Sequence, residues 1–217
     1  MSEIDISYRG ILKVAIPISL GSFVQFLVVI TDNFFLSKVH MNAMNGAGNS
    51  ALLYITLLMF AIGLSSAVQI LVARRHGEGK FVEAGETLAN GFWIMLLSGF
   101  VLSGILFWAN HSLLPLITSS PEVLDNMNRF LDIRALGLIL YPIVLMIIAF
   151  YSGIARTLVM FFATLITAGV NIFLDWVLIF GNLGAPQLGL EGAAWATVSA
   201  EVSALIFLIF YLLLDKG

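Results

Sequence analysis

The chain has 217 residues, of which 60% are hydrophobic and 11% are charged, with a formal net charge of -3 and a mean hydropathy of +1.02. Soluble domains carry about 25% charged residues, so this composition excludes a soluble globular fold and indicates a membrane protein. Cysteine is absent, which excludes disulfides, thiol catalysis and cysteine-ligated metals. No phosphate-binding glycine loop of the GxxxxGK[ST] type and no nucleic-acid motif occurs along the chain.

Six apolar segments are long enough to cross a bilayer, which takes about 20 residues of helix. In chain order they are 11–36, 48–73, 88–110, 131–152, 158–181 and 191–214. The first is too long for the apolar core of a secretory signal, and no cleavage site follows it, so we expect it to be a span. Ser120 and Pro121 predict the start of a short separate helix before the fourth span. The predicted fold is an all-α membrane protein, a bundle of six transmembrane helices.

The distribution of lysine and arginine predicts the orientation of this bundle, because cytoplasmic loops are enriched in both. Seven of these residues fall on one side and three on the other. The first group is Arg9, Lys13, Arg74, Arg75, Lys80, Arg156 and Lys216, and the second is Lys38, Arg129 and Arg134. We therefore expect both termini to be cytoplasmic, in a multi-pass protein of a prokaryotic plasma membrane.

Two aspartates, Asp32 and Asp175, lie inside apolar segments. A carboxylate at such a depth is costly unless it is protonated, paired or bound to a cation, and its usual role is ion or proton coupling. Asp32 lies roughly 6 Å below the outer end of the first span, given the rise of about 1.5 Å per residue. Asp175 lies about six residues, or roughly 9 Å, below the outer end of the fifth span.

Three further polar residues are placed to meet these acids in the outer half of the bundle. Asn171 is one helical turn from Asp175 on the same face, and Thr197 and Glu201 repeat this spacing in the sixth span. Their oxygen atoms suit a proton or a small cation such as sodium. Alternatively, they only hydrogen-bond between helices. Glu201 either shares a proton with Asp175 or faces a water-filled cavity.

Two residues of the first span complete the candidate set. Gln25 lies seven residues before Asp32 and so shares its helix face, where it either lines the same cavity or hydrogen-bonds to a neighbouring helix. Pro17 removes a backbone hydrogen bond, which predicts a point of bending.

The segments 171–181 (NIFLDWVLIFG) and 188–197 (LGLEGAAWAT) resemble the fifth-to-sixth helix signature of the multidrug and toxic compound extrusion (MATE) family. Pro17 followed by Thr31 and Asp32 is similar to the first helix of that family, and 73–79 is similar to its second-to-third loop. The resemblance runs from about Ile11 to Leu214.

This resemblance implies a secondary antiporter that exports organic cations or drugs in exchange for protons or sodium, with no enzymatic activity. It also implies that Asp32, Asn171, Asp175 and Thr197 bind the coupling ion, sodium included, and that the first helix bends at Pro17. Glu201 departs from the family pattern, in which a glutamine or a small residue is commoner at that position.

Members of the family have two six-helix lobes and about twice this length, and the chain resembles only the amino-terminal lobe. It would therefore pair with a second lobe or a second copy of itself, in the bilayer, around a small organic and cationic substrate. The alternatives are a non-transporting isolated lobe and a lipid-linked oligosaccharide flippase, which the scarcity of arginine in the spans disfavours. A remote alternative is an intramembrane aspartyl protease, although its Gly-x-Gly-Asp motif is missing.

Overall fold

The structure is a computed structural model that describes residues 7–39, 41–118 and 120–215. Helix α1 spans Tyr8–Ser37, α2 Met41–Gly77, α3 Phe81–Ser112, α4 Leu114–Ile117, α5 Pro121–Gly153, α6 Thr157–Phe180 and α7 Leu190–Leu214, with a short 3-10 turn at Asn182–Gly184. Six of these helices are long and apolar enough to cross a membrane, which confirms the predicted all-α bundle. Lys216, counted above for the orientation, lies outside the described residues.

The helix before the fourth span is not separate, so that prediction was wrong. The Ser120 hydroxyl caps the helix as predicted, accepting a hydrogen bond from the Val123 backbone N–H at 3.5 Å. The helix then continues without a break to Gly153. The segment between Pro121 and Gly137 contains neither glycine nor proline, so the chain has no residue that favours a break there. The fourth span and its lead-in are one helix, α5.

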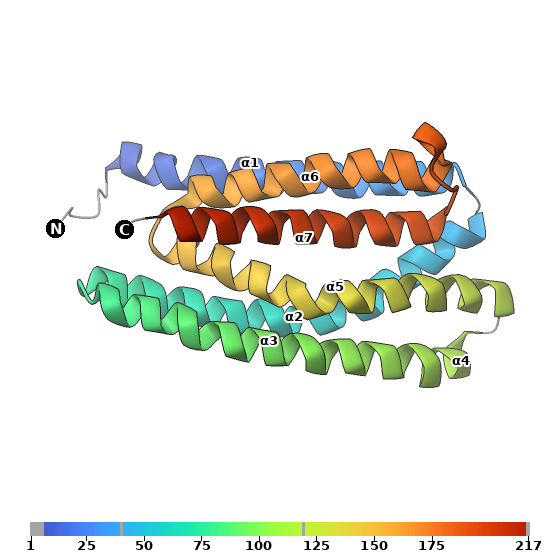
Figure 1. Ribbon diagram of the computed structural model, residues 1–217, viewed down its shortest axis with the longest axis horizontal. Helices are drawn as coiled ribbons and strands as arrows, with labels where there is room; N and C mark the ends of the chain where they lie inside the picture. Colours follow the sequence, from blue (N-terminus) through green and yellow to red (C-terminus); the bar gives the residue numbers. More distant parts are fainter. Residues whose placement is uncertain (1–6, 40, 119, 216–217) are drawn as a thin grey trace.

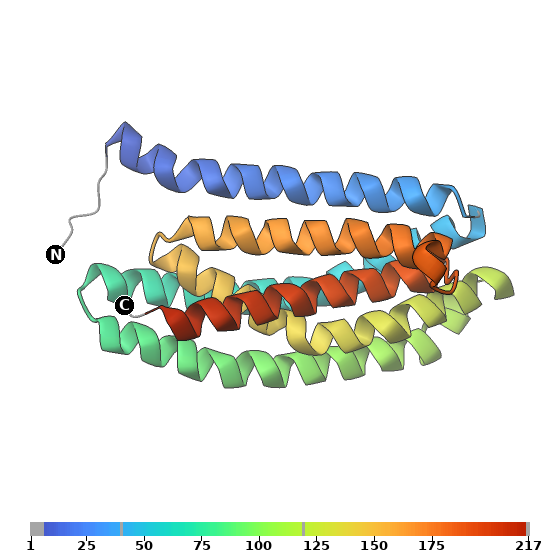
Figure 2. The same ribbon diagram turned by 45° about the horizontal axis from the view of Figure 1, so that its top comes forward.

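Helix α5 is the central helix of the bundle. It packs against α2, α3 and α7, while α6 packs against α1 and α7 (Figures 1 and 2). Of its most apolar stretch, 61% is buried, compared with 11% for α1. Helix α1 therefore lies at the edge of the bundle, held mainly by α6, and most of its apolar surface is left for lipid or for another part of a larger protein.

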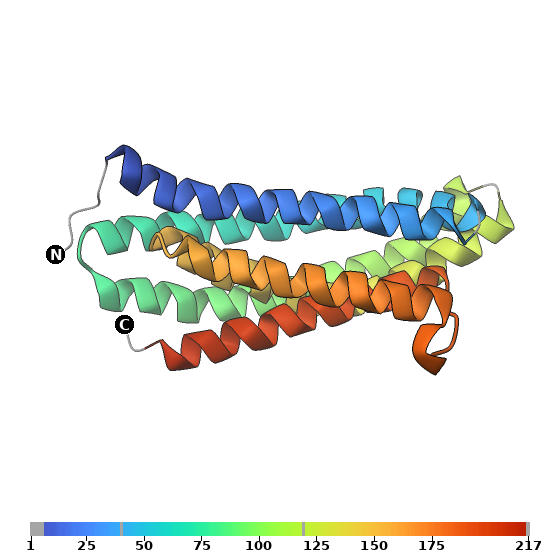
Figure 3. The ribbon, with the colours of Figure 1, turned by 90° about the horizontal axis from the view of Figure 1, so that it is seen from above.

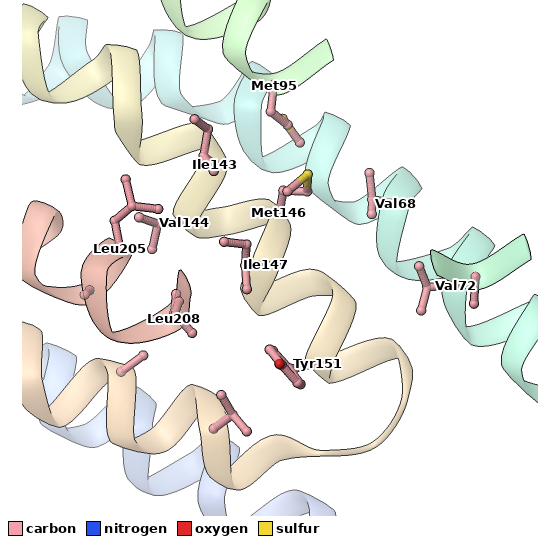
Figure 4. Close-up of a cluster of buried hydrophobic side chains, with 14 residues drawn as sticks. Val68, Val72, Met95, Ile143, Val144, Met146, Ile147, Tyr151, Leu205 and Leu208 are labelled. Carbon is pink, nitrogen blue, oxygen red and sulfur yellow. The ribbon is translucent and has the colours of Figure 1, made fainter. Parts of the chain in front are cut away.

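The largest buried cluster lies around the second half of α5. Its side chains Ile143, Val144, Met146 and Ile147 meet side chains of α2, α3 and α7, as Figure 4 shows. The partners labelled there are Val68, Val72, Met95, Leu205 and Leu208. A small residue brings α3 against this helix, since a Cβ on Gly99 would lie 2.4 Å from the Ile139 carbonyl oxygen.

The two described ends of the chain lie at the same end of the bundle, as an even number of spans requires (Figures 1 and 3). The α2–α3 and α5–α6 connections are at that end, and the α3–α5 and α6–α7 connections are at the other. The sidedness of the protein in a membrane stays a prediction.

Candidate functional site

The candidate site begins with two carboxyl groups from adjacent helices. Asp32 is in the last third of α1 and Asp175 is in the last third of α6, so both lie toward the end of the bundle away from the termini. The two side chains are close enough to interact directly. Asp175 is 0% exposed, and Asp32 is partly buried. The structure thus brings these two predicted residues together.

Neither aspartate has a hydrogen-bond donor among the described residues. Both carboxyl oxygens of Asp175 and Oδ1 of Asp32 are buried without a partner. Two ionised carboxylates in contact repel each other and have no proton to share. A proton or a cation between the two groups would remove this repulsion.

Asn171 and Thr197 extend this polar group toward α7. The Asn171 side-chain N–H donates to Thr197 Oγ1 at 3.4 Å, and the Thr197 hydroxyl donates to the Ala193 backbone oxygen at 2.9 Å. The amide oxygen of Asn171 is buried and has no partner. Asn171 and Asp175 are one turn apart on α6, as the spacing predicted.

Four oxygen atoms are therefore available in one region: Oδ1 of Asp32, both carboxyl oxygens of Asp175 and Oδ1 of Asn171. They are hard donors of the type that bind protons and alkali cations. Within the described residues no group of three or more acidic or histidine side chains comes together. Two carboxyl groups have the charge to hold one proton or one monovalent cation, so the residues present fit the predicted coupling ion.

Glu201 does not belong to this cluster, and both predicted environments for it were wrong. Its carboxylate receives a hydrogen bond from Arg134 at 3.0 Å, and the two residues are 5% and 7% exposed. Glu201 therefore neither shares a proton with Asp175 nor faces an open cavity. Residue spacing does not indicate this partner, because Arg134 lies near the start of the predicted fourth span.

Arg134 lies well inside α5 because that helix starts at Pro121, thirteen residues earlier. Its guanidinium also stacks on the Tyr54 ring of α2, with 4.1 Å between the guanidinium carbon and the ring centroid. Sequence reasoning missed both Arg134 and Tyr54. The signal that could have revealed Arg134 was the uninterrupted helical run that follows Pro121.

The two remaining predicted residues lie on α1. The Gln25 side chain is exposed on the bundle surface, so the described structure gives it no place beside Asp175. Pro17 is buried, and α1 continues through it as one helix in this conformation. Bending at Pro17 stays a prediction.

The fold and the site thus define the class of protein: a membrane-embedded helical lobe with a pair of neighbouring acidic side chains. Residues 17–177 match the model of the MatE family, and the chain belongs to this family. MatE proteins are transporters rather than enzymes, which removes the protease alternative. The protein is a multi-pass membrane protein.

Several curated relatives and solved structures are similar to the chain. It is 28% identical over 205 residues to the probable multidrug resistance protein NorM of Rhizobium meliloti, covering 94% of this chain and 44% of that relative. The Pseudomonas aeruginosa protein of the same name is 26% identical over 212 residues, covering 98% of this chain and 43% of the relative.

Among solved structures, an outward-facing multidrug resistance MATE transporter of the MOP superfamily superposes with a TM-score of 0.89 at 20% identity, over 95% of this chain and 45% of that one. A MOP superfamily transporter from Pyrococcus furiosus, described as having reversed polarity of its binding pocket, gives the same score and identity over the same shares. At this identity the structures establish the fold alone. The chain spans less than half the length of the relatives it matches.

Proposed function

We propose that this chain forms the amino-terminal lobe of a secondary antiporter that exports small organic cations or drugs in exchange for protons or sodium. The observation that carries the proposal is the Asp32–Asp175 pair, whose buried oxygens have no donor among the residues that the structure describes. A cluster that served only to hold helices together would satisfy its own hydrogen bonds, whereas an ion site leaves them open for the ion.

The coupling ion would bind between α1 and α6, with Asn171 and Thr197 completing the oxygen set. When it binds, the repulsion between the two carboxylates disappears and α1 can approach α6 more closely. Helix α1 is the least buried of the described spans, and Pro17 weakens its backbone hydrogen bonding. Bending of α1 at Pro17 would then change the volume of the substrate cavity.

A complete transporter needs more than this lobe. The relatives named multidrug resistance protein are more than twice as long as the matched region, so a second lobe, or a second copy of this chain, would close the substrate cavity. The exposed apolar faces of α1 and α3 leave room for such a partner within the bilayer.

A flippase for lipid-linked oligosaccharides is the second candidate, because it would use arginine to bind pyrophosphate. Arg134 is deep in the bundle, but its charge is already neutralised by Glu201 and its guanidinium is covered by Tyr54. It is therefore not available to an anionic substrate in this conformation, and export of cations is the better-supported function.

The test uses the purified chain in proteoliposomes, where uptake of a fluorescent organic cation is followed under a pH gradient and, separately, a sodium gradient. We expect uptake under one gradient, loss of it in Asp175→Asn, and normal uptake in the matched variant Asp125→Asn, whose side chain is exposed and pairs with Arg129 on the surface of α5. Pro17→Ala should slow uptake without preventing ion binding.

Full coupling in Asp175→Asn would exclude the proposed site. No uptake under either gradient, from correctly inserted protein, would show that the lobe does not transport alone, and the assay would then be repeated with a second lobe present.

A further inference from the structure

A buried ion pair lies beside the candidate site but outside it. Arg134 of α5 and Glu201 of α7 form it, and side chains of α2 and α5, Tyr54 and Tyr141, also act on the Arg134 charge. Glu201 Oε2 and the Tyr54 hydroxyl have no hydrogen-bond partner in the described chain. Moving two charges out of water is costly, and replacing such a pair by apolar side chains is often neutral or stabilising. A gain in the stability of the fold therefore does not explain why the chain has this buried ion pair.

The pair is linked to the candidate site in two ways. Glu201 is one helical turn after Thr197 on the same face of α7, and Thr197 contacts Asn171. In addition, the Arg134 charge acts electrostatically on the Asp32 carboxyl group. A permanent positive charge buried in the bundle opposes the binding of a cation at a neighbouring site.

Gly137, one turn after Arg134, leaves room for Glu201 beside the guanidinium. A Cβ at this position would lie 2.7 Å from Glu201 Oε2 and 2.9 Å from a methyl carbon of Val198. The carboxylate therefore lies where it offsets the arginine charge.

We propose that Arg134 and Glu201 set the affinity of the neighbouring site for a small monovalent metal cation. Arg134 weakens cation binding through its charge, and Glu201 limits this effect by neutralising Arg134. Glu201 is a positioning residue and does not contact the ion. The inference rests on the proposed function, since it takes Asp32, Asn171, Asp175 and Thr197 as the cation site.

The test measures sodium binding to the purified full chain in detergent by isothermal titration calorimetry. Glu201→Gln leaves the Arg134 charge unneutralised, and we expect sodium affinity to fall about tenfold or more, as a nearby unscreened charge predicts. The double variant Arg134→Met with Glu201→Leu removes both charges and should bind sodium at least as tightly as the unmodified chain. Glu201→Asp keeps the charge and should retain affinity within a few-fold.

The matched control is Glu191→Gln. Glu191 and Arg129 also form an ion pair between α7 and α5, at 3.2 Å, but both side chains are substantially exposed and lie toward the end of the bundle. Breaking this pair should leave sodium affinity unchanged. Circular dichroism of each variant checks that the helices are intact.

If the pair had only a structural role, Glu201→Gln and the double variant would weaken sodium binding alike, and that result would overturn the inference. The inference is equally overturned if the unmodified chain binds no sodium. It is also overturned if Glu201→Gln does not fold and the folded double variant binds sodium more weakly than the unmodified chain. The proposed function would survive these outcomes if uptake follows a pH gradient and requires Asp175.

Discussion

At the scale of single residues, Asp175 is completely buried and has no hydrogen-bond donor within the described part of the chain. A residue kept for ion binding in this way destabilises the fold that holds it. We therefore expect Asp175→Asn, an isosteric and uncharged change, to leave the free energy of unfolding unchanged or raise it by about 1 kcal/mol. Thermal unfolding of the purified protein in detergent at neutral pH measures this.

Asn110 provides the comparison, because it is as buried as Asp175 but its amide nitrogen donates two hydrogen bonds. It donates to the Asn128 backbone oxygen at 3.0 Å and to Asp132 at 2.9 Å. Asn110→Ala should cost about 1–3 kcal/mol of stability. A comparable loss in Asp175→Asn would mean that Asp175 holds the helices together and is not kept for an ion.

The residues of the candidate site also show how far sequence reasoning reaches. The rise per residue along a helix placed Asp32 and Asp175 in the outer half of the bundle, and the structure brings these two side chains together. The same reasoning could not place Glu201, since depth says nothing about which helix faces which. Its partner depends on the rotation of α7 and on α5 being continuous, and both follow from packing that hydropathy does not encode.

At the scale of helices, the α3–α5 contact depends on the absence of a side chain at Gly99. Gly99→Ala would place a Cβ against the Ile139 carbonyl oxygen, where α3 cannot move without disturbing the core around Met95. We expect a loss of about 1–3 kcal/mol in stability, typical of overpacking. Gly104→Ala, on the same helix with nothing within 4 Å, should be neutral or slightly stabilising. Equal unfolding temperatures for the two variants would contradict the close packing.

The six spans were predictable because each helix carries its own apolar stretch. The structure adds that the six helices are buried to very different extents. Helix α5 is buried on several sides and anchors the core, while α1 makes most of its contacts with one neighbour. This inequality suits the proposed mechanism, because an ion between Asp32 and Asp175 acts on the helix that is least restrained by the rest of the bundle.

At the scale of the whole molecule, the even number of spans places both described chain ends together, and the basic loops predict that this end is cytoplasmic. Arg134 is buried inside the bundle, so only Lys38 and Arg129 remain in the outer group, which strengthens the asymmetry. The chain contains no cysteine, so single cysteines can report on sidedness without any background.

Gly77→Cys marks the α2–α3 connection and Ser112→Cys the far end of α3, and both positions are exposed at opposite ends of the bundle. In intact cells, a membrane-impermeant maleimide should label Ser112→Cys and leave Gly77→Cys unlabelled until the cells are opened. The reverse labelling pattern would mean that the protein has the opposite orientation in the membrane and that the acid pair lies nearer the cytoplasm. An exporter driven by inward ion flow takes up its coupling ion from outside, so the expected labelling puts Asp32 and Asp175 on the side from which that ion arrives.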